Sequence, residues 1–221
     1  MATSLLLRKI KSALFSADER QFCILFGPYR GLRVIERPST SLQIRLGLWE
    51  RETYPALRHA LRRALWVIDV GSGGGELVIA FAKSTSASPI FAIDPDQSRC
   101  DRLNENMALN EVAQTSISVI RQSVGTKSLQ LDSLPVLRHL LGFIKIDVDG
   151  SEIDVLNSGL GLLAEARPLL LIETHSAELE NECIKLLASL SFSTRIIHNA
   201  RWRRIIPETR HGHNRWLLAR P

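Results

Sequence analysis

The sequence predicts an α/β fold with a mostly parallel central sheet and helices on both faces, and three observations support this. From about Ala64 onward, short apolar runs typical of buried strands alternate with segments of helical spacing. The first of these runs ends in a glycine-rich turn that leads directly into a helical segment. Acidic residues stand at the ends of four runs, where open α/β sheets bind their ligands.

A chain of 221 residues is long enough for one domain with a small appendage. Its composition, 45% hydrophobic and 23% charged, is that of an ordinary globular protein. No apolar run approaches the ~20 residues that span a bilayer, and Arg8 and Lys9 follow the apolar start, the wrong order for a secretory signal. The odd, widely spaced cysteines Cys23, Cys100 and Cys183 favour reduced thiols and no metal site. We therefore expect a cytoplasmic protein.

Charge is distributed unevenly along the chain. Residues 1–63 carry a net charge of +7, residues 64–198 carry −7, and residues 199–221 carry +5. Basic ends attract anionic partners such as a phosphorylated substrate, membrane headgroups or nucleic acid. A basic, solvated surface that only keeps the protein soluble is the alternative. The sequence leaves peripheral membrane contact and the oligomeric state open.

The first 63 residues are predicted to form an extension of a helix, a β-hairpin and a second helix, and residues 64–221 the main domain. The expected elements of the extension are a helix over residues 4–15, two strands within 21–36, a short strand over 42–46 and a helix over 50–65. The turn of the hairpin contains both glycine and proline, the strongest signals of a chain reversal. We expect this block to stand outside the cofactor-binding half.

In the main domain, predicted strands and helices follow one another in a regular order. The expected strands cover residues 66–70, 89–93, 116–121, 142–146, 169–172, 192–198 and 215–219. The expected helices cover residues 77–83, 97–110, 151–159 and 178–190. Gly159 and Gly161 are expected to stop the third of these helices.

The glycine-rich turn is the most informative segment. Glycine accepts φ > 0 and lets a ligand lie against bare main chain, and the helix that follows offers free N–H groups and a partial positive charge. A dinucleotide fingerprint would need glycine at position 76, which is Glu76, and a Walker loop would need a lysine before Lys83. The pattern resembles the first motif of S-adenosylmethionine-dependent methyltransferases, whose loop holds the amino-acid end of the cofactor. A turn without a ligand is the alternative.

Four acids follow apolar strands, namely Asp69, Asp94, Asp147 and Glu173. Carboxylates near a core are rarely tolerated without a partner, so the four together predict a site. Asp94 lies 19 positions past Gly75, close to the distance at which an acid accepts from ribose hydroxyls. A cap of the strand end before Pro95 is the alternative for this residue.

A second dense group of charged residues lies between positions 145 and 152. If Lys145 and Asp147 share one face of a strand, both point to the same side of the site, and the lysine could orient or deprotonate an acceptor hydroxyl. Asp149 and Glu152 fit such a site and equally fit a helix N-terminus, where anions are favourable. His175, just past the fifth strand, is a second candidate base, although a lone histidine often has a structural role.

These segments together resemble FkbM-type methyltransferases. The matching blocks, in the family's order, are residues 69–75, 91–96, 103–110, 131–134, 144–152 and 171–175. The resemblance implies a Rossmann-like class I methyltransferase fold and transfer of a methyl group from S-adenosyl-L-methionine. The usual acceptor in this family is a hydroxyl of a sugar, glycolipid or natural product.

The candidate site residues follow from the motifs and the resemblance together. Those expected to bind the cofactor are Asp69, Gly71, Ser72, Gly73, Gly75, Asp94 and Ser123. Those expected to act in catalysis are Lys145, Asp147, Glu152 and His175, with no metal ligand among them. Gly73, Asp94 and Asp149 stand where the family usually has Asn, Glu and Glu, which bears on details of the site.

Three other functions stay open. A nucleic-acid methyltransferase would use the basic ends, where Trp202 among arginines can stack on a base, but the Pro-Pro motif of base-amine methyltransferases is replaced by Val148-Asp149. An NAD-dependent oxidoreductase would lack its third glycine. A methyltransferase-like binding module without turnover is the third. The expected partner is a small-molecule or glycan acceptor.

Overall fold

The computed structural model describes residues 19–36, 43–85, 87–200 and 213–221. The strands of its main sheet are β3 (Trp66–Val70), β4 (Ile90–Ile93), β5 (Ser118–Ile120), β6 (Gly142–Ile146), β7 (Leu169–Thr174), β8 (Ser193–Ile197) and β9 (Arg215–Arg220). Their order across the sheet is β5-β4-β3-β6-β7-β9-β8. The five strands from β5 to β7 are parallel, and β9 runs antiparallel to both of its neighbours.

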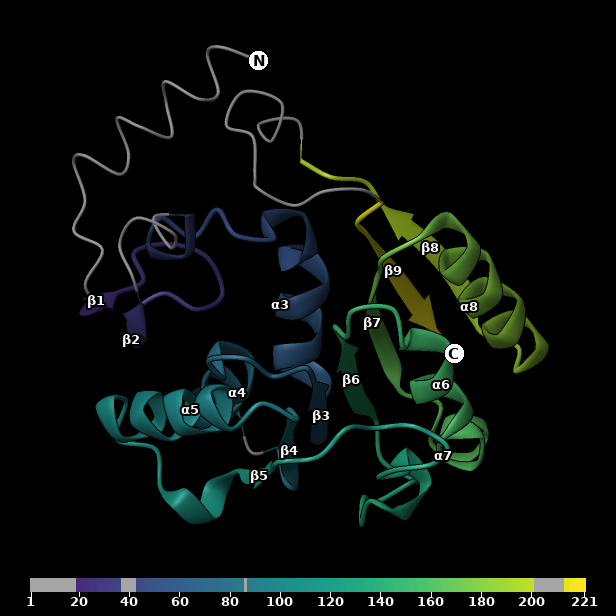
Figure 1. The fold of residues 1–221 in the computed structure, drawn as a ribbon, viewed down its shortest axis with the longest axis horizontal. Coiled ribbons are helices and arrows are strands. Elements are labelled where there is room, and N and C mark those ends of the chain that lie inside the picture. Colours follow the sequence, from purple (N-terminus) through teal and green to yellow (C-terminus); the bar gives the residue numbers. More distant parts are fainter. Residues whose placement is uncertain (1–18, 37–42, 86, 201–212) are drawn as a thin grey trace.

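Helices cover both faces of this sheet (Figure 1). They are α3 (Tyr54–Arg63), α4 (Glu76–Ser84), α5 (Gln97–Leu109), α6 (Glu152–Asn157), α7 (Leu160–Ala166) and α8 (Ala177–Ser189). Short 3-10 helices cover Arg51–Thr53 (η1), Gln114–Ser116 (η2) and Leu131–Ser133 (η3). The predicted α/β architecture, a mostly parallel sheet with helices on both faces, is confirmed.

Two hydrophobic cores result from this layering, one on each face of the sheet. Successive side chains of a strand point to opposite faces, so Val67 joins the core under α3, α4 and α5. Its neighbours Trp66 and Ile68 join the core under α6, α7 and α8. All five residues of β3 are buried, as expected for a central parallel strand.

The helix predicted over residues 151–159 is interrupted. α6 ends at Asn157. α7 begins at Leu160 and includes Gly161, which was expected to end the preceding helix. The reason is Asp132, whose carboxylate accepts the N–H groups of Gly161 at 3.1 Å and Leu162 at 2.5 Å. A carboxylate that accepts from free N–H groups favours a helix N-terminus. The two glycines therefore lie at the start of α7 and do not end a longer helix.

The N-terminal block packs directly on the main domain. Its strands β1 (Arg20–Cys23) and β2 (Arg33–Glu36) form an antiparallel pair, as the sequence predicts. Asn110, which caps the C-terminus of α5, accepts from the Arg33 N–H at 2.9 Å and donates to the Arg33 carbonyl at 2.6 Å. Asn106, one turn earlier in α5, accepts from the Ile35 N–H at 2.9 Å. These two asparagines therefore supply the backbone of β2 with hydrogen bonds that a neighbouring strand would otherwise give.

Two expectations for this block are wrong or fall outside the described residues. Residues 43–45 are helical, whereas a strand was predicted over 42–46. The helix predicted over residues 4–15 lies outside the part of the chain that the structure describes, as do the arginines around Trp202.

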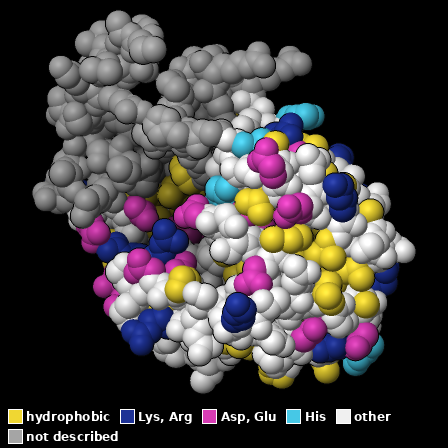
Figure 2. Space-filling model, turned by 45° about the vertical axis from the view of Figure 1, so that its right-hand side comes forward, with side chains coloured by type: hydrophobic (Ala, Val, Ile, Leu, Met, Phe, Trp, Pro, Cys, Tyr) yellow, Lys and Arg dark blue, Asp and Glu magenta, His cyan; other side chains and the backbone are white. Residues whose placement is uncertain are grey.

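Among the described helices, none is long and apolar enough to cross a membrane. On the face shown in Figure 2, acidic and basic side chains lie interspersed over the described residues.

Candidate active site

The site lies at the carboxyl ends of the central strands. β3 has β4 on one side and β6 on the other. Strands β4 and β5 therefore extend the sheet in one direction from β3, and the later strands extend it in the other. Such a switch in strand order opens a crevice for ligands in α/β sheets. A cavity of about 520 Å³ lies here, lined by the glycine turn and by Asp69, Lys145 and Asp147. A second cavity of about 260 Å³ adjoins it and shares Gly71, Arg99 and Asp147 with it.

The glycine turn is positioned by backbone contacts to both neighbouring strands. The N–H of Gly71 donates to the Ile93 carbonyl at 2.8 Å, and the N–H of Asp147 donates to the Val70 carbonyl at 2.9 Å. A Cβ at Gly71, whose φ is +78°, would lie 1.9 Å from the Asp147 carbonyl oxygen. Gly73, with φ +53°, has open space where its Cβ would be. Glycine is therefore required at 71 by packing, and at 73 it leaves main chain exposed to the cavity.

Asp94 serves the structure of the turn as well as the cavity. Its carboxylate is 1% exposed, and it accepts from the N–H of Asp96 at 3.0 Å and of Gly73 at 3.2 Å. It therefore caps its own strand end, as one sequence-based alternative predicts, and also holds the glycine turn. Asp94 and Ser123 both line the smaller cavity. Ser72, which is buried, donates its N–H to the Ile93 carbonyl.

Lys145 and Asp147 share one side of the site, as the sequence predicts. The Lys145 ammonium lies 3.0 Å from Oδ2 of Asp147 and 3.6 Å from Oδ1 of Asp69. Burial lowers the pKa of Lys145, but Asp147, Asp69 and Glu50 raise it by more, so its net pKa lies well above the usual range. Burial raises the pKa of Asp69 to about 6, against the lowering effect of Lys145. Lys145 is therefore a fixed cation at neutral pH.

Glu152 lies in the first turn of α6 and also contacts His175. Its side chain is 0% exposed, and it accepts from the N–H of Gly150 at 3.3 Å and contacts Nδ1 of His175. Hydrogen bonding to Glu152 raises the pKa of His175, burial opposes this, and the charges of Glu152, Asp147 and Asp149 add to it. Nε2 of His175 lies 3.3 Å from Oδ1 of Asp149.

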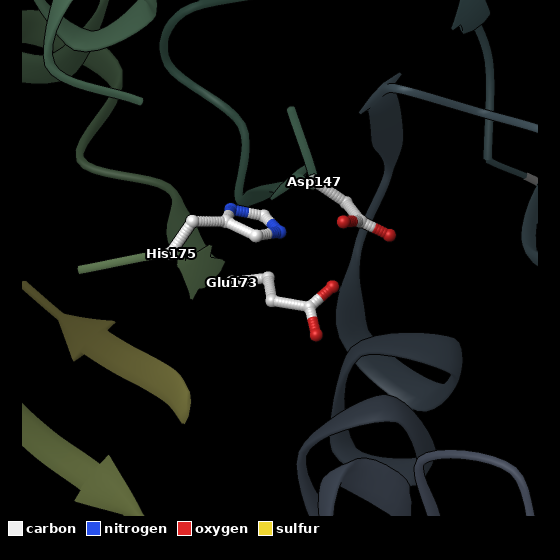
Figure 3. A group of neighbouring side chains, drawn as sticks. All are labelled: Asp147, Glu173 and His175. Carbon is white, nitrogen blue, oxygen red and sulfur yellow. The ribbon is translucent and has the colours of Figure 1, made fainter. Parts of the chain in front are cut away.

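Asp147, Glu173 and His175 converge at the same edge of the sheet (Figure 3). One oxygen of each carboxyl group and one ring nitrogen lie within 4.8 Å of one another. Glu173 is 2% exposed and is the penultimate residue of β7, which extends past the predicted end at residue 172; the sequence marked it as a strand-end acid without assigning it a role. The cysteines, by contrast, are free, and Cys100 and Cys183 are buried.

Sequence reasoning missed the N-terminal wall of the large cavity. Tyr29, Trp49, Glu50 and Tyr54 line it opposite the glycine turn, although this block was expected to stand apart from cofactor binding. Burial raises the pKa of Tyr29 well above its usual range, and the charge of Glu50 adds to this. These residues lie outside the motifs of the main domain, and the packing of β2 on α5 and of α3 on α4 brings them to the cavity.

The strand order and the ligand crevice define the Rossmann-like fold of class I methyltransferases. The chain is similar to the crystal structure of methyltransferase FkbM from Methylobacillus flagellatus KT, with a TM-score of 0.59, 19% identity, and coverage of 83% of this chain and 48% of that one. It thus spans about half the length of that protein.

Two other structures show the same fold. A ribosomal protein L11 methylase from Lactobacillus delbrueckii subsp. bulgaricus has a TM-score of 0.53, 20% identity and coverage of 76% of each chain. TYW2 of M. jannaschii, solved in complex with AdoMet, has a TM-score of 0.53, 14% identity and coverage of 93% of this chain and 86% of that one.

The family is established by sequence. The model of the methyltransferase FkbM domain matches residues 90–212, more than half of the chain. The chain belongs to the FkbM methyltransferase family, as the motifs predict. No curated protein matches it significantly.

Proposed function

We propose that this protein transfers a methyl group from S-adenosyl-L-methionine to a hydroxyl of a sugar, glycolipid or natural product. Membership of the FkbM family supports methyl transfer, and the AdoMet complex of the M. jannaschii neighbour supports the cofactor by analogy of fold. The residues of this chain must still fit the cofactor and the acceptor on their own chemistry.

The larger cavity fits the amino-acid end of the cofactor. Oδ1 of Asp69 is buried and has no hydrogen-bond partner among the described residues, while Lys145 stays 3.6 Å away. A buried polar atom left without a partner costs about 1–3 kcal/mol, and the ammonium group of the cofactor is a matching donor. The bare main chain at Gly73 leaves room for the rest of that end.

The smaller cavity fits the nucleoside end. Asp94 and Ser123 line it together with Pro95 and Gln122. A carboxylate has about four lone-pair sites, and two backbone N–H groups and the Arg99 guanidinium, at 3.5 Å, occupy three of those of Asp94. Acceptor capacity therefore remains for one ribose hydroxyl, and for a second where the 56% exposed Arg99 side chain turns away. Because the two cavities meet at Gly71 and Asp147, one elongated ligand can occupy both.

The acceptor would lie on the side of Lys145, Asp147 and Glu173. When bound, the cofactor supplies an electrophilic methyl group on sulfonium sulfur, so that a hydroxyl oxygen gains the methyl, the carbon–sulfur bond breaks and a proton is released. Lys145 is held protonated, so we assign it to orienting the acceptor and not to removing the proton. Holding reactants in line supplies roughly 7–11 kcal/mol of the barrier reduction in such reactions.

The observation that carries this proposal is the buried Oδ1 of Asp69, which accepts no hydrogen bond from the described residues, beside a glycine turn at the switch point of the sheet. A thermal shift with S-adenosylhomocysteine, compared with NAD, tests it. At 100 times its dissociation constant a ligand adds ~2.7 kcal/mol, which is about 5–10 °C for a domain of this size. A shift with NAD and none with S-adenosylhomocysteine would overturn the proposal.

The acceptor class needs its own assay. Incubation with cofactor labelled in the methyl group and with hydroxylated acceptors should place label in methyl ethers, which resist alkaline hydrolysis. Label in oligonucleotides, together with oligonucleotide binding that weakens steeply as the salt concentration rises, would favour the nucleic-acid alternative instead. Cofactor binding without transfer to any class of acceptor would favour a binding module.

A further inference from the structure

We propose that Asp147, Glu173 and His175 form a binding site for a divalent cation of the Mn²⁺ type. One atom from each side chain lies within 4.8 Å of the other two. Ligands about 2.1 Å from one cation lie roughly 3–4.2 Å apart, so shifts of less than about 1 Å complete the set. Figure 3 shows a ring nitrogen of His175 turned towards the carboxyl groups of the two acids.

The three side chains come from the carboxyl ends of two adjacent strands, β6 and β7. The N–H of Asp147 donates to the carbonyl of Val70, which fixes the residue directly after β6. Glu173 belongs to β7 and pairs with Trp216 of β9. His175 follows one residue after the end of β7. One ligand therefore lies in a strand and the other two directly follow strands, where the sheet restricts their positions.

His175 has the surroundings of a metal-binding imidazole. Its Nδ1 contacts Glu152, which is 0% exposed. A buried carboxylate at one ring nitrogen holds the proton there and leaves the lone pair of Nε2 for a cation, an arrangement that recurs around protein metal sites. Asp149 lies 3.3 Å from Nε2, but its side chain is 93% exposed and can turn into solvent.

An independent observation is the pair of buried acids that flank the three ligands. Asp69 is 1% exposed and lies against Lys145, and Glu152 is 0% exposed and lies against His175. Oδ1 of Asp69 and Oε2 of Glu152 are buried without a hydrogen-bond partner among the described residues. Buried carboxylates are stable when they are paired or bind a metal, so this edge of the sheet favours a further cation.

The donor set selects the kind of cation. Carboxylate oxygens suit Mg²⁺, Ca²⁺ and Mn²⁺, while an imidazole nitrogen suits first-row transition metals. Two carboxylates with one imidazole therefore favour Mn²⁺ over the first two. A hydroxyl bound to such a cation loses its proton more readily. His175 would then be a ligand, and the cation would take over the activation of the acceptor. This use of the cation rests on the proposed methyl transfer, whereas cation binding does not.

Titration of the chelator-treated full chain with MnCl₂, followed by electron paramagnetic resonance of free Mn²⁺, tests the proposal. We expect one bound Mn²⁺ per chain, and a dissociation constant at least about tenfold higher for Glu173→Gln and for His175→Ala. Pulsed spectra of bound Mn²⁺ should show coupling to imidazole nitrogen that His175→Ala removes. Glu182→Gln and His139→Ala change the same residue types at exposed positions and should bind Mn²⁺ normally.

Failure of this proposal is distinguishable from failure of the proposed function. A chain that binds S-adenosylhomocysteine but no Mn²⁺, or whose Mn²⁺ binding is the same in all four variants, would overturn the cation site alone. Mn²⁺ binding that depends on Glu173 and His175 supports the site even without cofactor binding. If either variant fails to fold by circular dichroism, Asp147→Asn, at a side chain 27% exposed, replaces it with the same expected loss.

Discussion

Asp94 follows β4 and Asp69 lies near the end of the neighbouring strand β3, yet their carboxylates are used differently. Asp94 accepts two backbone N–H groups, whereas Oδ1 of Asp69 has no hydrogen-bond partner among the described residues. The first acid therefore builds the turn, whereas the second is paired with Lys145 at 3.6 Å and can still accept a hydrogen bond from a ligand. Substitutions at the two positions should accordingly fail in different ways.

Asp94→Ala should weaken binding of S-adenosylhomocysteine about 10- to 100-fold, because hydrogen bonds to a charged group contribute about 1.5–3 kcal/mol. Isothermal titration calorimetry measures the change. Asp101→Ala removes an exposed carboxylate from the same helix region and serves as the control. An affinity equal to that of the unaltered chain would refute the ribose role of Asp94.

The affinity for S-adenosylhomocysteine should fall as the pH is lowered through about 6. Burial raises the pKa of Asp69 to about 6, so the residue is a carboxylate above this pH and neutral below it. Only the carboxylate attracts the ligand's ammonium group, hence about a tenfold loss at pH 5 relative to pH 7. Asp69→Asn should bind S-adenosylhomocysteine weakly at both pH values, and the ratio of its affinities at pH 7 and pH 5 should approach one. An equal pH dependence in both proteins would exclude Asp69 as the titrating group.

At the scale of elements, the turn after β3 and helix α5 are joined into one unit. Asn106 of α5 donates to the Gly74 carbonyl at 2.9 Å and accepts from Ile35 of β2 at 2.9 Å. One buried side chain therefore links the glycine turn to the N-terminal hairpin. The sequence predicts a helix for the segment containing Asn106 and a family resemblance over residues 103–110, and the structure gives the role of this side chain.

Asn106→Ala should lower the free energy of unfolding by about 2–4 kcal/mol, because two backbone groups lose their partner at a buried position. It should also weaken cofactor binding, since the turn loses its contact to α5. Asn104→Ala, at a half-buried position of the same helix, should change stability by less than about 1 kcal/mol. Chemical denaturation of both variants measures this, and equal stabilities would contradict the linking role.

Gly71→Ala and Gly73→Ala form a matched pair within the turn. A Cβ at 71 would lie 1.9 Å from the Asp147 carbonyl oxygen, whereas one at 73 meets nothing within 4 Å. We expect Gly71→Ala to abolish stable folding or to shift the thermal midpoint strongly. Gly73→Ala should cost only the left-handed backbone penalty of about 1–2 kcal/mol while still obstructing ligand binding. Similar thermal midpoints for the two variants would contradict this reading of the turn.

At the scale of the whole molecule, sequence periodicity was enough to predict the sheet. Trp66–Val70 and Gly142–Ile146 have the predicted bounds, because fully buried strands are continuous apolar runs. The strand-end acids also follow from the sequence, since parallel strands must end at one edge.

The rest depends on contacts that no local pattern encodes. The packing of the hairpin over the cavity arises from Asn106 and Asn110 reaching β2 across about 70 residues of chain. The insertion of β9 between β7 and β8 is a choice of strand pairing. The approach of His175 to Asp147 and Glu173 requires both strand ends in place. Cysteine counting, which predicted no metal site, could not detect a group of oxygen and nitrogen donors.

A crystal structure of the chain with S-adenosylhomocysteine tests the central claim most directly. We expect the ammonium group of the ligand at Oδ1 of Asp69, its amino-acid end against Gly73, and its ribose at Asp94. The sulfur should then face the edge formed by Asp147, Glu173 and His175. Ligand density away from the glycine turn, or a cavity filled by protein side chains in saturating ligand, would contradict the account.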